Sequence, residues 1–285
     1  MNYTSINNID DINAWIDEAK ALKANPLGHI ELGKNKTLGL LFFNSSLRTR
    51  LSTQKAALNL GMNPIVMNVS GDAWGIEFGD GTVMNGNTAE HIKEAAAVVS
   101  QYCDIIAVRA FPSLTDKAKD ESELVLKSFA KFASVPIVNM ESATGHPLQG
   151  LTDALTISEN AKTSKPKVVL SWAPHIKALP HAVGNSFVQA MQKMDVEFVI
   201  ANPEGYDLNP EITGNTPIYH NQEEAFKDAD FVYTKNWSSY EDYGKVLSTC
   251  LLYTSPSPRD HSRYRVCRLL LEKMGGGGGG GGGGG

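Results

Sequence analysis

The stretch TLGLLFFNSSLRTR, residues 37–50, places an apolar run directly before a segment with helical spacing. Thr37–Phe43 is apolar enough for a buried strand, and apolar residues recur with the helical period over Leu47–Leu60. Where a strand leads into a helix, free backbone N–H groups and the helix dipole favour an anion. The sequence therefore predicts a strand, a turn and a helix, with an anion site at the turn.

Strand-like and helix-like segments alternate along the rest of the chain. Further strands are predicted over Pro64–Asn68, Asp104–Ala110, Pro136–Asn139, Lys167–Ser171, Val196–Ala201 and Asp230–Thr234. Further helices are predicted over Ile12–Leu22, Glu90–Gln101, Glu121–Phe132, Leu148–Asn160, Val183–Met194 and Glu223–Lys227. This alternation is typical of parallel sheets with helices on both faces. The predicted fold is α/β, with two doubly wound parallel-sheet domains joined by a connecting helix.

The alternation restarts after His146-Pro147, so we place a domain boundary there. The first domain then spans residues 1–146 and the second spans residues 147–249. Ligands of such sheets bind beyond the carboxyl ends of the strands, often in a cleft between two halves. We expect the ligand site in that cleft.

Residues 250–285 have a different character. They are basic and proline-containing up to residue 274 and end in the glycine run Gly275–Gly285. Polyglycine has no side chain to bury and a large conformational entropy to lose. The phrase CLLYTSPSPRD resembles translated adapter sequence. We interpret 250–285 as a foreign or disordered tail, with a short helix over Arg265–Lys273.

Composition restricts the class of protein. The chain has 285 residues, 42% hydrophobic and 20% charged, with a net charge of −5, which is ordinary globular composition and gives no electrostatic case for nucleic acid or an anionic membrane as partner. No apolar run approaches the ~18 residues of a membrane span, and the N-terminus lacks the blocks of a signal peptide. The cysteines, Cys103, Cys250 and Cys267, are too scattered for a disulfide framework or a zinc site. A cytoplasmic protein is expected.

The turn after the first predicted strand carries the clearest chemistry. Ser46 and Thr49 offer hydroxyl donors, while Arg48 and Arg50 offer planar guanidinium groups suited to phosphate. The simpler alternative is a capped helix whose arginines are solvated. A nucleotide-dependent oxidoreductase would share the α/β pattern, but neither G-x-G-x-x-G nor a P-loop follows that strand.

These residues resemble a known family. Ser-x-Arg-Thr-Arg at 46–50, Arg109 at a strand end and His146-Pro147-Leu148-Gln149 are similar to marks of the aspartate/ornithine carbamoyltransferases, in the same order. The resemblance runs from about Asn7 to Ser248. It is closest to the N-succinylornithine and N-acetylornithine branch, through FFNSSLRTR, the Trp74 loop and the segments 141–144, 172–175 and 235–237. The Asp-x-x-x-Ser-Met-Gly motif typical of the ordinary ornithine enzyme is absent from the sequence.

The resemblance implies transfer of a carbamoyl group from carbamoyl phosphate to the δ-amine of an N-acylated ornithine, a step of arginine biosynthesis. It implies no metal and no organic cofactor, and a homotrimer in which Trp74 reaches a neighbouring subunit's site. The implied catalytic residues are Arg48, Arg109, His146 and Gln149. Ser46, Leu47, Thr49, Arg50 and Trp74 join them as implied carbamoyl-phosphate-binding residues. The implied substrate-binding residues are Glu141, His175, Lys177, Lys235 and Ala89.

Three points leave alternatives open. Ala89 stands where the branch uses proline or glutamate to discriminate acyl chains; we favour succinyl, because nothing acidic there repels a second carboxylate. Lys177 has a simpler alternative as a solvated surface cation. The family's His-Cys-Leu-Pro motif and terminal helix do not follow Leu247-Ser248-Thr249, so the alternative function is a truncated, inactive fragment that only binds carbamoyl phosphate.

Overall fold

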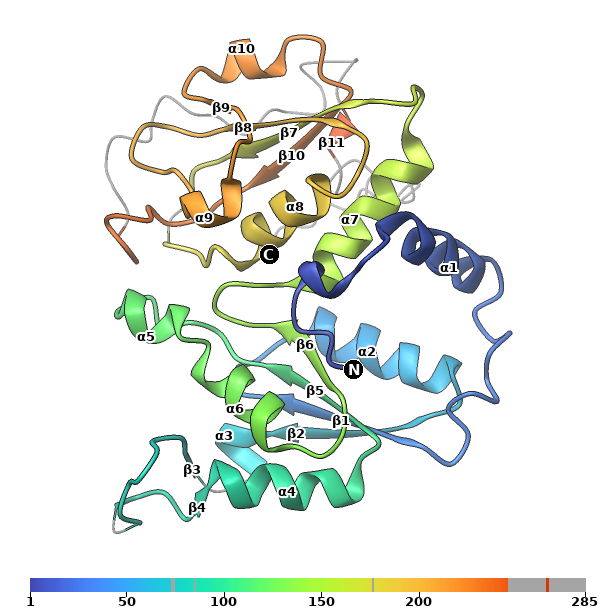
Figure 1. The fold of residues 1–285 in the computed structure, drawn as a ribbon, viewed down its shortest axis with the longest axis vertical. Coiled ribbons are helices and arrows are strands. Elements are labelled where there is room, and N and C mark those ends of the chain that lie inside the picture. The colour runs from blue at the N-terminus through green and yellow to red at the C-terminus, as the bar shows by residue number, and fades with distance from the viewer. Residues whose placement is uncertain (73–74, 85, 176, 246–264, 267–285) are drawn as a thin grey trace, which may run out of the picture.

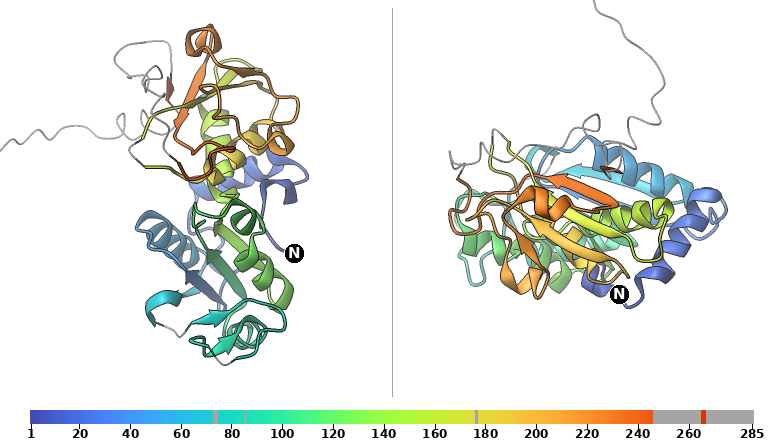
Figure 2. Two further views of the ribbon diagram at one scale, coloured as in Figure 1. Left: turned by 90° about the vertical axis from the view of Figure 1, so that its left-hand side faces the viewer. Right: turned by 90° about the horizontal axis from the view of Figure 1, so that it is seen from above.

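Two parallel sheets lie one above the other along the long axis of the molecule, each flanked by helices (Figures 1 and 2). The computed structural model describes residues 1–72, 75–84, 86–175, 177–245 and 265–266. Within these ranges the predicted α/β class and the two-sheet organisation are confirmed.

The first sheet has the strand order β2-β1-β5-β6, and all its pairs are parallel. Adjacent residues of β1 face opposite sides: Leu40 packs with helix α2 and Leu41 with helices α4 and α6. The sheet is therefore buried on both faces, as its continuous apolar strands indicated. The bounds are β1 Thr37–Phe42, β2 Asn63–Asn68, β5 Ile105–Arg109, β6 Ile137–Glu141, α2 Arg48–Asn59, α4 Ile92–Tyr102 and α6 Leu124–Phe132.

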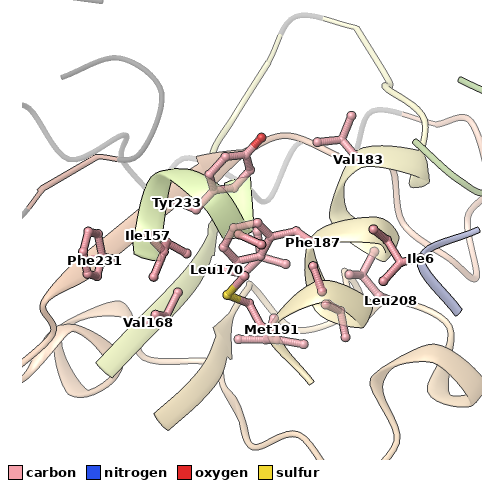
Figure 3. Close-up of a cluster of buried hydrophobic side chains, with 14 of the residues drawn as sticks. Ile6, Ile157, Val168, Leu170, Val183, Phe187, Met191, Leu208, Phe231 and Tyr233 are labelled. Carbon is pink, nitrogen blue, oxygen red and sulfur yellow. The ribbon is translucent and has the colours of Figure 1, made fainter. Parts of the chain in front are cut away.

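The second sheet has the order β11-β10-β7-β8-β9, again with parallel pairs. Its larger core cluster includes Phe187, which stacks on Tyr233 with ring centroids 4.4 Å apart (Figure 3). A smaller cluster under helix α10 covers the other face. The bounds are β7 Lys167–Trp172, β8 Glu197–Ala201, β9 Ile218–Tyr219, β10 Phe231–Lys235, β11 Arg265–Val266, α7 Pro147–Asn160, α8 Ala182–Met191 and α10 Gln222–Phe226.

The remaining elements are short connections and one N-terminal helix. They are η1 Ile6–Asn8, α1 Ile12–Ala24, α3 Val69–Asp72, β3 Ile76–Glu77, β4 Glu90–His91, α5 Lys117–Glu121 and α9 Pro210–Thr213. Strands β3 and β4 pair with each other and form a separate two-stranded sheet. No helix in the described ranges is both long and apolar enough to cross a membrane.

The N-terminal segment contacts both halves. The Tyr3 backbone exchanges hydrogen bonds with Ile137 and Asn139 of β6, at 2.8 and 2.9 Å. A few residues later, Ile6 and Ile12 are buried in the core cluster of the second sheet. Figure 1 shows α1 beside the connecting helix α7. The domain limits at 146 and 249 stay predictions.

The connecting helix α7 leads directly from β6 to the second half and crosses α8 closely. A Cβ atom at Gly150 would lie only 2.7 Å from the Ser186 carbonyl oxygen, so a side chain there would force the two helices apart. Gly150 is buried, and a Cβ there would also lie 3.1 Å from Ile6 Cδ1. The glycine therefore permits the close approach of α7 and α8.

A second contact between the halves joins the loop after β5 to the segment after β10. The Tyr243 hydroxyl donates to Asp120 Oδ2 at 3.1 Å, and Lys117 Nζ donates to the Tyr240 carbonyl oxygen at 3.2 Å. Gly244 has φ +75°, and a Cβ there would overlap the Leu114 carbonyl oxygen. The two loops are therefore in direct backbone contact.

Three predicted elements need correction. The helix predicted over Glu121–Phe132 is wrong as one element: α5 and α6 are separated because Glu123 has φ +54°, a left-handed conformation that ends an α-helix. The helix predicted from Glu90 begins only at Ile92, because Glu90 and His91 pair with β3.

The helix predicted over Arg265–Lys273 is wrong at its start. Arg265–Val266 form strand β11 and pair with Phe231 and Val232 of β10, because an edge strand offers unpaired N–H and C=O groups to a neighbouring chain segment. The remainder of the predicted tail lies outside the described residues.

Buried His181 predicts a loss of stability in mild acid. Its Nε2 donates to the Ser238 carbonyl oxygen at 2.7 Å, and burial lowers its pKa from the ordinary value of 6.5. Below that value the unfolded chain takes up a proton that the folded chain resists, so the free energy of unfolding falls as the pH falls. Urea unfolding between roughly pH 7.5 and 5.5 should show a flatter dependence for His181→Asn. Substitution of the exposed His29 by Gln is the control. If stability depends on pH as steeply in His181→Asn as in the unchanged chain, His181 is not the residue responsible.

Candidate functional site

A cleft of about 560 Å³ opens where the carboxyl ends of the two sheets face each other. The register of the first sheet sets Phe42, Arg109 and Glu141 side by side at this edge. In the second sheet, Lys235 pairs with Trp172 at the equivalent edge. The lining residues are Ser46, Leu47, Arg48, Thr49, Ser52, Thr53, Arg109, Glu141, His146, Leu148, Gln149, Thr152, Val183 and Lys235.

The turn before α2 supplies one wall of the cleft. The Ser46 hydroxyl accepts a hydrogen bond from the Thr49 N–H at 3.3 Å, which supports the first turn of the helix. Arg48 is exposed, and its guanidinium forms no hydrogen bond or ion pair with any other described residue. No acidic residue lies in the first turn. This wall therefore combines a cation with the positive end of a helix dipole.

A buried ion pair forms the base of the cleft. Arg109 Nη2 lies 3.1 Å from Glu141 Oε2, and the two residues are 5% and 8% exposed. Arg109 Nη1 donates to the carbonyl oxygens of Asn44 and Ser45, at 3.2 and 2.9 Å. Its guanidinium also lies 4.0 Å from the centre of the Phe111 ring. The pair therefore joins the end of β5 to the end of β6 and to the turn before α2.

The start of α7 brings two further polar groups to the cleft. His146 is the residue before the helix, and its Nε2 lies 3.7 Å from Glu141 Oε2. Its backbone N–H donates to the Ser186 hydroxyl at 2.8 Å. One turn into the helix, Gln149 Nε2 donates to Asp153 Oδ1 at 2.8 Å. Glu141 therefore lies between the Arg109 guanidinium and the His146 imidazole.

Not every residue implied by the resemblance lines this cleft. Arg50 turns towards β2, where it donates to Asn68 Oδ1, and lies over the Phe42 ring at 5.1 Å. His175 and Lys177 are exposed and line a separate cavity of about 30 Å³ beside Trp172. The His175 ring accepts a hydrogen bond from the Lys177 N–H at 3.1 Å.

Ala89, implied as a substrate-binding residue, does not line the cleft. Ala89 is exposed, and its N–H donates to the Gly75 carbonyl oxygen at 3.1 Å, which closes the base of the loop between the two residues. Trp74 lies outside the described residues.

Several polar residues of the cleft were not predicted from the sequence. Ser52 and Thr53 lie one turn after Arg48 and Thr49 on α2, and Thr152 lies one turn after Gln149 on α7. Helical spacing of three or four residues was the signal that could have identified them. In the part of the chain that the structure describes, no group of three or more His, Cys, Asp and Glu side chains could hold a metal ion.

Comparison with known proteins gives the family. Residues 2–159 match the carbamoyl-phosphate-binding domain of aspartate/ornithine carbamoyltransferases. The N-succinylornithine carbamoyltransferase of Bacteroides fragilis is 47% identical over 249 residues, which is 87% of this chain and 78% of the relative. The chain belongs to the aspartate/ornithine carbamoyltransferase family.

Further members support this membership. The N-acetylornithine carbamoyltransferase of Xanthomonas axonopodis pv. citri is 40% identical over 82% of this chain and 72% of its own length. A mutant N-acetyl-L-ornithine transcarbamylase, crystallised with carbamyl phosphate and N-succinyl-L-norvaline, superposes with a TM-score of 0.79. It shares 37% identity and is matched over 86% of this chain and 78% of its own. The two-sheet fold of this chain is therefore also the fold of a known carbamoyltransferase.

The buried ion pair generates a stability prediction. Glu141→Ala leaves the Arg109 guanidinium without its carboxylate in a site that water barely reaches, which should lower the free energy of unfolding by about 3–5 kcal/mol. Urea unfolding measures this loss. The control is Lys23→Ala, which breaks the exposed Lys23–Glu159 pair and should cost no more than about 1 kcal/mol. Equal losses in the two variants would show that the ion pair has no structural role.

Proposed function

We propose that this chain transfers the carbamoyl group of carbamoyl phosphate to the δ-amine of an N-acylated ornithine, with N-succinyl-L-ornithine favoured over N-acetyl-L-ornithine. The observation that carries the proposal is the joining of two cationic walls in one cleft. Arg48 and Arg109 belong to the first half, and Lys235 belongs to the second. A phosphorylated donor and a carboxylated acceptor can therefore bind face to face.

The phosphate group binds at the start of α2 in this proposal. Arg48 makes no hydrogen bond or ion pair with a described residue, so binding of phosphate breaks no such contact. Thr49 lines the same wall. Arg109 is already held by Glu141, but its buried Nε has no described hydrogen-bond partner. An N–H donor fixed in place and left without an acceptor suits an oxygen of the donor substrate.

The carbamoyl group lies next to α7. His146 hydrogen-bonds the carbonyl oxygen, and Gln149 orients the carbamoyl NH₂. The neutral δ-amine attacks the carbamoyl carbon and a tetrahedral oxyanion forms. The carbon–oxygen bond to phosphate then breaks, and the departing phosphate takes the proton that the attacking nitrogen loses. Arg109 and His146 stabilise the charge that develops on the carbonyl oxygen, and the fixed side chains reduce the entropy that must be lost.

The acylated amino acid binds on the side of the second half. Lys235 pairs with one of its carboxylates, and Glu141 lines the same cleft. His175 and Lys177 stay predicted substrate residues, although they line a separate cavity. Three points support a succinyl acceptor: the absence of charge on Ala89, the cationic Lys235, and higher identity to the succinylornithine relatives than to the acetylornithine relatives.

The proposal assigns carbamoyl phosphate to residues 1–146 and the amino acid to residues 147–249. A homotrimer with Trp74 in a neighbouring site, and a cytoplasmic location, stay predictions. The alternative of a fragment that only binds carbamoyl phosphate has less support, because the relatives that match most of the chain are named as transferases.

Arg48→Ala should weaken carbamoyl-phosphate binding by roughly 10- to 100-fold, because a charge-assisted contact contributes about 1.5–3 kcal/mol. The affinity of Arg48→Lys should lie between those of the unchanged chain and Arg48→Ala, since lysine keeps the charge but loses the planar guanidinium group. Calorimetric titration measures the affinities. Lys55→Ala, on the same helix but outside the cleft lining, is the control. Unchanged affinity in Arg48→Ala would remove the phosphate site from this wall.

A substrate panel tests the reaction itself. Turnover with carbamoyl phosphate is measured for N-succinyl-L-ornithine, N-acetyl-L-ornithine and ornithine. We expect the highest kcat/KM with the succinyl compound, because only its acyl group carries an additional carboxylate. Carbamoyl-phosphate binding without turnover of any acceptor would support the binding-only alternative, and a preference for free ornithine would refute the proposed acceptor class.

A further inference from the structure

The loop of residues 142–146 connects β6 to α7 and carries His146 to the cleft. A second cavity, of about 220 Å³, borders this loop and shares no lining residue with the cleft. Ser142, Thr144 and Gly145 all line it. Ser142 is 2% exposed and Ala143 is 8% exposed, so the rest of the loop is packed against the protein. On the side of the cavity, close packing is missing and hydrogen bonds fix the loop instead.

One carboxylate oxygen supplies most of these bonds from the first half. Glu123 Oε1 accepts from the Ser142 hydroxyl at 2.8 Å, from the Thr144 N–H at 2.7 Å and from the Thr144 hydroxyl at 2.5 Å. Hydrogen bonds to an ionised acceptor are stronger than those between neutral groups. The Glu123 carboxylate is thus the common acceptor for two residues of the loop.

The backbone at Glu123 is in an unfavourable conformation. Its φ of +54° and ψ of +37° lie in the left-handed region, which residues with a Cβ rarely adopt. A residue keeps such a conformation only where surrounding contacts hold it there. Here the contacts to Ser142 and Thr144 hold it, and the break between α5 and α6 places its side chain against the loop.

Helix α8 supplies the matching bonds from the second half. Asn185 Nδ2 donates to the Thr144 carbonyl oxygen at 3.0 Å, and the Ser186 hydroxyl accepts from the His146 N–H. The Thr144 peptide and side chain are therefore held between Glu123 and Asn185. Because His146 follows two residues later, the position of Thr144 determines where His146 lies.

We infer that Glu123 is a positioning residue for carbamoyl transfer: it fixes the 142–146 loop and thereby the direction of the His146 imidazole. The inference rests on the proposed function. Glu123 touches no reacting atom in this scheme. Its effect passes through His146, where a displacement of about 1 Å can cost roughly 100-fold in rate.

The decisive variant is Glu123→Gly. Glycine adopts the left-handed conformation without strain, so the fold should be preserved while the carboxylate is lost, and relief of strain should offset part of the fall in thermal midpoint caused by the three lost hydrogen bonds. We expect kcat to fall by roughly 10- to 100-fold. Binding of inorganic phosphate should stay within about twofold, because the Arg48 wall is untouched. Glu123→Gln, which keeps an acceptor oxygen without its charge, should recover part of the rate.

A double-variant cycle separates positioning through His146 from any independent role. In a His146→Ala background, Glu123→Gly should have no further effect on kcat, because the group that it positions is already absent. The same fold loss in both backgrounds would overturn the inference. A kcat within about twofold of the unchanged chain for Glu123→Gly alone would also overturn it. Glu204→Gln, in an exposed loop, is the control for removal of a carboxylate.

The imidazole resonances of His146 test the inference without turnover. Glu123→Gly should shift them, and Glu204→Gln should not. Unchanged His146 resonances in Glu123→Gly would refute the positioning role even if the unchanged chain transferred no carbamoyl group. Shifted resonances in a chain without transfer would uphold the role and refute the proposed function.

Discussion

The buried pair of Arg109 and Glu141 is the interaction on which the rest of the site depends. An irregularity in the pairing of β5 and β6 sets Arg109 opposite Glu141, although regular pairing would have set it opposite Met140. Since side chains alternate across a strand, a shift of one residue changes which face a side chain occupies. The bulge therefore brings cation and carboxylate together at the carboxyl edge of the sheet, where the cleft begins.

The same arginine fixes the wall of the cleft formed by the turn before α2. By donating to the Asn44 and Ser45 carbonyl oxygens, it ties the turn before α2 to the end of β5. The Asn44 side chain adds a second link between the same two segments, because its Oδ1 accepts a hydrogen bond from the Phe111 N–H. The helix terminus that faces the cleft, the arginine at its base and the carboxylate beneath them therefore form one connected network. Loss of one member exposes the others to movement, as expected of buried polar networks.

Three contacts set the distance between the halves, and with it the width of the cleft. The N-terminal segment bonds to β6 and buries Ile6 and Ile12 in the second core. The 142–146 loop bonds to Glu123 of the first half and to Asn185 and Ser186 of α8 in the second. On another side, Asp120 accepts from Tyr243, one residue before the backbone contact at Gly244. Arg109 and Lys235 line one cleft because all three contacts join elements far apart in sequence.

The sequence by itself determined the α/β class, most strands and helices, and the turn after Phe42 that leads into a helix, because period and apolar content are local properties. It also identified Arg48, Arg109, His146, Gln149 and Lys235, all of which line the cleft. Only the tertiary structure decided that Arg50 turns to Asn68, that His175 and Lys177 line another cavity, and that Glu123 interrupts a helix to hold a loop. These outcomes depend on which side chains meet across distant segments. No pattern of neighbouring residues encodes such a meeting, because it follows from strand register and helix crossing.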